Sequence, residues 1–426
     1  MNFYKKIIFF FFCFFPAFLW SHKYDYELSK KLTEDYIRLL KNNDTGIDFY
    51  KKYKKIKKNF PGVFLRYSKD SGLAWYDKEK DRIFLNTKYV MIFFDIKNYS
   101  DEKIIAVLYF SSQTRRELVK YSDSVYFHEL VHSFQDFKYG DSRYFKEGLF
   151  LELEYEAYLL SDMYFFDKIK KEKNLFVEFL KGEYSDVYFS EYAWGLLSVS
   201  WDMDEYKKNI NMRYLNEVKG YVSLTEEEIK RKYALEEKKI ISYAVGDRLG
   251  VKREAGDFEK LKKQKEEYSK FLEDYYKNIW PDFSYKVLRF LIDVSYEAKN
   301  YFVFFNSAYH FKKNSKVFGY QKDKEIEEKE ALFYLDFLNF LKDRDKKDFE
   351  LVAAEISAFE KFCDLSFRDI PDWVIKIRDE NYKKTYAKYL KIVQNEKDEV
   401  KKNYYIENMS YFCSKVKDLS CDNLIK

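Results

Sequence analysis

Hydrophobic residues recur at helical spacing over much of this chain. Between residues 22 and 60, apolar positions lie three or four residues apart among lysines and acidic residues, which predicts amphipathic helices. The same spacing returns after residue 100 and predicts another helix. We expect a further helix to begin near Ser122 or Ser124, since serine is a favoured N-cap residue.

Residues 61–99 show a different pattern, with short apolar runs separated by polar residues. Residues 72–76 (GLAWY) and 82–86 (RIFLN) flank the polar sequence DKEKD, and this arrangement predicts a β-hairpin. Residues 89–94 (YVMIFF) form an uninterrupted apolar run, which we interpret as a third strand.

From about residue 200 onward the pattern is helical almost throughout. Charged residues of both signs alternate with apolar positions, as is typical of helices with one solvated face. The chain has 426 residues, which is more than one typical domain uses. We therefore expect an α+β fold, with a mixed domain at residues 22–200 and a mainly α-helical domain at residues 201–426.

The first 21 residues predict a secretory signal peptide. Two lysines precede an apolar run from Ile7 to Trp20, which is shorter than the ~18 or more apolar residues of a typical membrane-spanning helix. Cleavage after Ser21 would leave no stable membrane span, and we expect an exported protein, periplasmic or secreted. An uncleaved membrane anchor is the alternative interpretation.

Composition and charge exclude some classes of protein. The chain is 46% hydrophobic and 21% aromatic, unlike a disordered protein. Its 77 basic and 72 acidic residues leave a net charge of +5, and its basic clusters are interleaved with acids, so we expect no nucleic-acid partner.

In an oxidising compartment, two of Cys363, Cys413 and Cys421 can form one disulfide, or all three can be packed thiols.

Residues 128–132 carry the strongest chemical signal, because they read His-Glu-Leu-Val-His, an H-E-x-x-H motif. Residues four apart share one face of a helix, so the imidazoles of His128 and His132 can bind one metal ion. Glu129 can then act as general base toward a water that the metal activates. With four histidines in the chain, the motif arises by chance in roughly three chains per thousand.

A catalytic zinc site needs a third protein ligand and leaves one position open for water. No third histidine follows at short spacing, whereas the strongly apolar segment 146–166 contains several acids. Burying an unpaired carboxylate is costly, and a metal ion would remove that cost for one of them. The candidates are Glu147, Glu152, Glu154 and Glu156.

The sequences HELVHSFQ and EYEAY resemble the zincin metallopeptidases of the gluzincin type, over about residues 60–165. In those enzymes the third ligand is a Glu on the next helix, often within an E-x-x-[small]-[Asp/Asn] stretch. The resemblance implies a zincin-like catalytic domain in which Zn²⁺ is bound by His128, His132 and Glu154, with Glu129 as general base.

The same resemblance assigns two further positions. Ala157 occupies the small position, and Tyr158 occupies the position of the residue that orients a histidine ring. Tyrosine departs from the family's carboxylate or carboxamide there, so Asp136 and Asp162 are alternatives for that role. Glu147 followed by glycine resembles the third ligand of other zincins and remains an alternative to Glu154.

These observations favour an exported zinc metallopeptidase that hydrolyses a peptide or protein substrate. The hairpin at residues 72–86 is a candidate edge strand for an extended peptide, and His310 is a spare histidine for stabilising an oxyanion. One alternative is a catalytically quiet zincin-like binding protein of the cell envelope, motivated by the long helical half. Another is an envelope enzyme that attacks an electrophile other than a peptide.

Overall fold

The computed structural model describes residues 21–69, 71–139, 150–199, 203, 206–207, 209–210, 255–343, 348–396, 399–416 and 419. The chain divides into two compact units. The first comprises Met1–Glu172, Tyr184–Leu196 and Lys207–Trp280, and the second comprises Lys173–Glu183, Leu197–Tyr206 and Pro281–Lys426. Residues 1–20 of the predicted signal peptide at 1–21 and the expected domain boundary at 200–201 lie outside the described residues.

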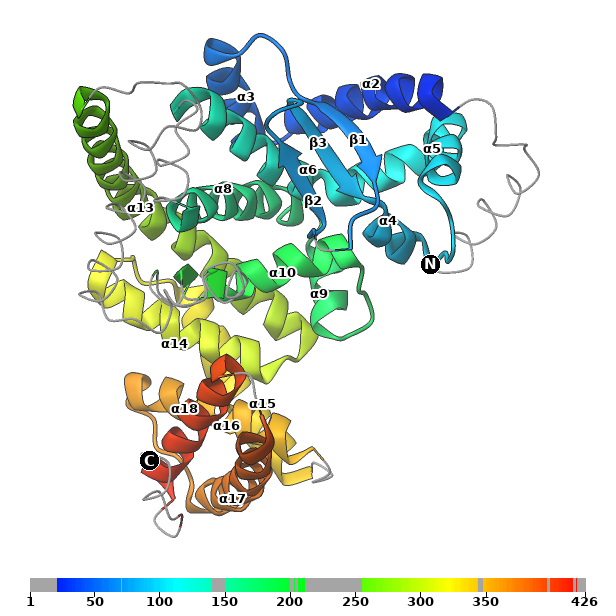
Figure 1. The fold of residues 1–426 in the computed structure, drawn as a ribbon. Coiled ribbons are helices and arrows are strands. Elements are labelled where there is room, and N and C mark those ends of the chain that lie inside the picture. The colour runs from blue at the N-terminus through cyan, green and yellow to red at the C-terminus, as the bar shows by residue number, and fades with distance from the viewer. Residues whose placement is uncertain are drawn as a thin grey trace. The chain divides into compact units, whose positions relative to one another are not determined.

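The first unit contains a three-stranded sheet (Figure 1). Strands β1 (Gly62–Arg66), β2 (Ala74–Asp77) and β3 (Arg82–Asn86) lie in the order β1-β3-β2. Strands β2 and β3 are antiparallel, which confirms the predicted hairpin. Strand β1 runs parallel to β3 and was not predicted, because its apolar run of three residues, Val63, Phe64 and Leu65, is too short for periodicity to separate strand from helix.

The other elements of the first unit are helices, several of which lie behind and beside the sheet (Figure 1). They are α2 (Ser21–Leu40), α3 (Asp44–Ile56), α4 (Thr87–Phe94), α5 (Asp101–Phe110), α6 (Ser112–Tyr139), α8 (Phe150–Ile169), most of α10 (Val187–Val199) and the first part of α13 (Ala255–Ala298). The helices predicted between residues 22 and 60 and after residue 100 are confirmed. With the sheet, they make the architecture α+β.

The apolar run at residues 89–94 is helical, so its interpretation as a third strand was wrong. It forms most of α4, which Asn86 caps by accepting a hydrogen bond from a backbone N–H in the first turn. Val90 and Phe93 are buried whereas Ile92 is exposed, which is helical rather than alternating burial. The run is too short for its composition to separate the two structures, and the cap favours the helix.

Helix α6 begins at Ser112, ten residues before the predicted start at Ser122 or Ser124, so that prediction was also wrong. Both predicted caps are buried inside the helix. The Ser122 hydroxyl donates a hydrogen bond to the carbonyl of Leu118 at 2.7 Å and lies 2.6 Å from the hydroxyl of Tyr36 on α2. Ser122 therefore joins two helices in the interior.

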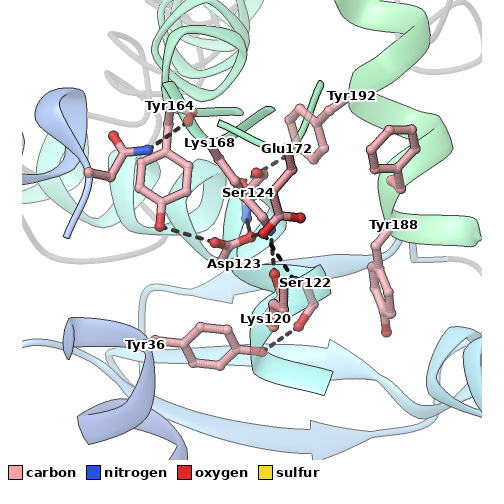
Figure 2. Close-up of polar contacts among 12 residues, drawn as sticks. Tyr36, Lys120, Ser122, Asp123, Ser124, Tyr164, Lys168, Glu172, Tyr188 and Tyr192 are labelled. Carbon is pink, nitrogen blue, oxygen red and sulfur yellow. Dashed lines mark hydrogen bonds and ion pairs between the residues drawn. The ribbon is translucent and has the colours of Figure 1, made fainter. Parts of the chain in front are cut away.

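A buried polar network centred on Asp123 fixes α6 against α8 (Figure 2). The Asp123 carboxylate accepts hydrogen bonds from the Lys168 ammonium at 2.7 Å and from the Tyr164 hydroxyl at 3.2 Å. Burial raises the pKa of Asp123 despite the neighbouring Lys168. The ion pair therefore pays a desolvation cost that its hydrogen bonds offset, and it sets how α8 lies on α6.

The regular elements among the described residues of the second unit are all helices. Its helices are α9 (Lys173–Leu180), the last part of α13, α14 (Tyr301–Phe318), α15 (Lys324–Asp343), α16 (Phe349–Ser366), α17 (Asp372–Asn395) and α18 (Glu399–Lys415). Aromatic rings on α14, α15 and α16 form its main core. The prediction of a mainly helical second half is confirmed for these residues.

The two cysteines among the described residues differ in state. Cys363 is a free thiol buried in the second unit, and burial raises its pKa to about 12. Cys413 is disulfide-bonded, and Cys421 lies outside the described residues.

No helix among the described residues is both long and apolar enough to cross a membrane.

Replacing Lys168 by methionine (Lys168→Met) should lower the free energy of unfolding by about 3 kcal/mol, because the Asp123 carboxylate stays buried without its cation. Urea denaturation measures this loss. Lys171→Met, at an exposed lysine just beyond the same helix, is the control and should change stability by less than about 0.5 kcal/mol. Equal effects of the two substitutions would contradict the assigned role of the Asp123 network.

Candidate metal centre

Two helices bring the candidate ligands together. His128 and His132 lie one turn apart on α6, and Glu154 lies on α8, which packs along α6. His128 and Glu154 are buried, and His132 is half-buried. Each helix is embedded on most of its faces, so neighbouring apolar side chains hold these polar groups in place.

Three side chains converge at this point. The Nε2 atoms of His128 and His132 are 3.1 Å apart; that of His128 lies 3.4 Å from Oε2 of Glu154, and that of His132 lies 3.4 Å from Oε1. A tetrahedral zinc ion with bonds of about 2.0–2.1 Å would hold its ligand atoms about 3.3 Å apart. The separations therefore fit a single zinc ion, and two imidazoles with one carboxylate are a donor set of catalytic zinc sites.

Within the described residues, these three side chains form a group able to hold a metal ion, with ligand atoms within 4.8 Å of one another. Glu152 is half-buried and does not belong to the group, and Glu147 lies outside the described residues. Glu156 is buried and accepts a hydrogen bond from Gln135 instead. His310 lies on α14 in the second unit.

Charges in the cluster depend strongly on one another. Burial raises the pKa of Glu154, but the two imidazoles outweigh it and hold that pKa well below its usual range. Burial likewise lowers the pKa of His132, but the Glu154 carboxylate outweighs it and raises the pKa to about 9. Without an ion, the cluster therefore retains positive charge beside the carboxylate, in the place where a cation would bind.

Glu129 lies beside this cluster and is also buried. The backbone N–H of Tyr76 on β2 lies near enough to its carboxylate to lower its pKa. Burial raises the pKa of Glu129 and the Glu154 carboxylate adds to that rise, while the imidazoles and the Tyr76 N–H oppose it. The carboxyl group is thus close enough to the three ligands to respond to their charges.

The contact between Gln135 and His132 was not predicted from the sequence. The Gln135 side-chain oxygen lies 2.9 Å from Nδ1 of His132, in the role expected of Tyr158, Asp136 or Asp162. The ring of Tyr158 packs instead against His128, with centroids 4.5 Å apart, and Asp136 lies 3.7 Å from the Lys78 ammonium. The position of Gln135 could have indicated this contact, because a residue three after His132 on a helix lies on the same face.

Replacing Glu154 by glutamine (Glu154→Gln) should weaken zinc binding by more than about 100-fold, beyond the loss typical of residues that only contact a metal ligand. The physical reason is that the carboxylate charge and a ligand oxygen are both lost. Competition with a chromogenic chelator measures this affinity.

The matched control is Glu152→Gln, two residues earlier on the same helix, which should bind zinc within about twofold of the unmodified chain. A large loss in the control, or unchanged affinity after Glu154→Gln, would show that another residue supplies the third ligand.

Comparison with known proteins adds no further guide to the site. No family model, curated protein or solved structure matches this chain. The site is therefore interpreted from its own side chains: two imidazole nitrogens and a carboxylate converge beside a buried glutamate.

Proposed function

We propose that the protein is an exported zinc-dependent metallopeptidase of the gluzincin type. The observation that carries this proposal is the convergence of His128, His132 and Glu154 at separations suited to one zinc ion. A purely structural zinc site has no use for a buried acid beside it, so Glu129 favours a hydrolytic role. The predicted signal segment is what supports export.

Bound zinc would supply Lewis acidity and lower the pKa of a water in the open position. Glu129 would accept the proton from that water as the peptide carbonyl is attacked, and would then deliver it to the departing amine. The nearby N–H of Tyr76 favours the ionised form of Glu129, which is the form that accepts the proton. His128, His132 and Glu154 keep their places throughout.

The sheet supports a peptide as substrate. Strand β2 lies at one side of the sheet, and its Tyr76 N–H faces Glu129 rather than β3. A peptide that lay extended along this edge would bring its carbonyl groups close to the general base, and backbone hydrogen bonds would hold it there regardless of its sequence.

Replacing Glu129 by glutamine (Glu129→Gln) should lower peptide hydrolysis by about 10²- to 10⁴-fold, because the carboxamide cannot accept the proton of water. Zinc content should stay unchanged, since Glu129 is not a ligand in this proposal. Cleavage of a denatured protein or a mixed peptide library, followed by mass spectrometry, measures the activity.

Glu117→Gln, about three turns earlier on α6, is the matched control and should keep its activity. Unchanged hydrolysis after Glu129→Gln would exclude the proposed mechanism. A zinc-loaded, folded wild type that cleaves nothing across such a library would favour the quiet binding protein instead.

A further inference from the structure

The two ring nitrogens of His132 face different surroundings. Nε2 faces His128 and Glu154, whereas Nδ1 lies 2.9 Å from the side-chain oxygen of Gln135. Metal ligation through Nε2 requires that nitrogen to be unprotonated, so the proton must reside on Nδ1. Which ring nitrogen carries the proton is therefore a functional property of the site.

Gln135 determines that choice. Its side-chain nitrogen donates hydrogen bonds to the backbone carbonyl of Leu153 at 3.0 Å and to Oε2 of Glu156 at 2.8 Å. A backbone carbonyl only accepts, so the amide nitrogen must point toward it and the amide oxygen must point toward His132. That oxygen also only accepts, and Nδ1 of His132 must therefore carry the hydrogen.

The same side chain positions the helix that carries the third ligand. Leu153 and Glu156 stand on either side of Glu154 along α8, and Gln135 on α6 holds them both. Gln135 and Glu156 are 3% and 6% exposed, so water does not replace these contacts. A buried carboxylate needs hydrogen-bond donors, and Gln135 provides one for Glu156.

His128 is held in a different way. Its Nδ1 is buried and has no hydrogen-bond partner among the described residues, and its ring packs on Tyr158. Of the two histidine rings, that of His132 is therefore the one held by a hydrogen bond. The Gln135 amide makes this bond and also contacts α8.

We propose that Gln135 and Glu156 are positioning residues that select the metal-binding tautomer of His132 and hold Glu154 against the two imidazoles. This inference rests on the proposed zinc site. It predicts that zinc affinity depends on the pairing of these two side chains, which are not themselves ligands.

The first test measures zinc affinity of the full chain by competition with a chelator. Gln135→Ala should bind zinc about 10- to 100-fold more weakly, while Gln113→Ala, at an exposed glutamine on the same helix, should match the wild type. A folded Gln135→Ala protein with wild-type affinity would overturn the inference. A wild type that binds no zinc would instead remove the proposed function.

Exchanging the side chains at positions 135 and 156 distinguishes the loss of their hydrogen bond from a general destabilisation of the fold. Gln135→Glu alone places two carboxylates against each other and should weaken zinc binding. Adding Glu156→Gln restores one donor and one acceptor between positions 135 and 156, though not the donor to the Leu153 carbonyl, and should recover part of that loss. A double variant that binds no better than Gln135→Glu alone would overturn the inference.

Nuclear magnetic resonance of the zinc-loaded wild type gives a readout that needs no variant. The Nδ1–H proton of His132 should be visible and should exchange slowly with water, because a buried amide oxygen accepts its hydrogen bond. A ring that carries its proton on Nε2, or exchanges that proton rapidly, would overturn the inference even if every substitution unfolded the chain.

Discussion

The packing of α8 along α6 is the constraint on which the rest of the site depends. It brings a carboxylate from one helix to within 3.4 Å of two imidazoles on the other, in an interior made mostly of apolar side chains. A deviation of 1 Å in this contact would separate the ligand atoms beyond the reach of one ion. Two buried contacts fix the helices, through Asp123 with Lys168 and through Gln135 with Glu156.

The position of the proposed general base follows from the same helix. Glu129 precedes the buried residue Leu130 on α6 and meets the N–H of Tyr76 on the neighbouring hairpin. The Tyr76 hydroxyl donates in turn to Asp81 at 3.0 Å, which ties the hairpin together beyond the strand. The sheet thus places a backbone N–H beside the proposed reaction centre, and its outer strand is the edge on which a peptide substrate is proposed to lie.

Local patterns were enough to predict the hairpin, most helices and the residues of the motif, because each depends on neighbours in sequence. They failed where a distant contact decided the outcome. Ser122 looks like a helix start, yet its hydroxyl meets Tyr36 in the interior. Residues 89–94 were misassigned for a local reason, because the cap at Asn86, which bonds the N–H of Lys88, favours a helix over a strand. Gln135 was missed because its role depends on Leu153 and Glu156, 18 and 21 residues away in sequence.

The most direct test of the central claim is the amount of zinc bound per chain, measured by elemental analysis of the purified protein after zinc is supplied and the excess removed. The account predicts about one zinc per wild-type chain and far less after His132→Ala, which removes one of the three ligands. His310→Ala, at a histidine outside the group, should retain the wild-type amount. No zinc in the wild type, or equal zinc in the wild type and His132→Ala, would contradict the account.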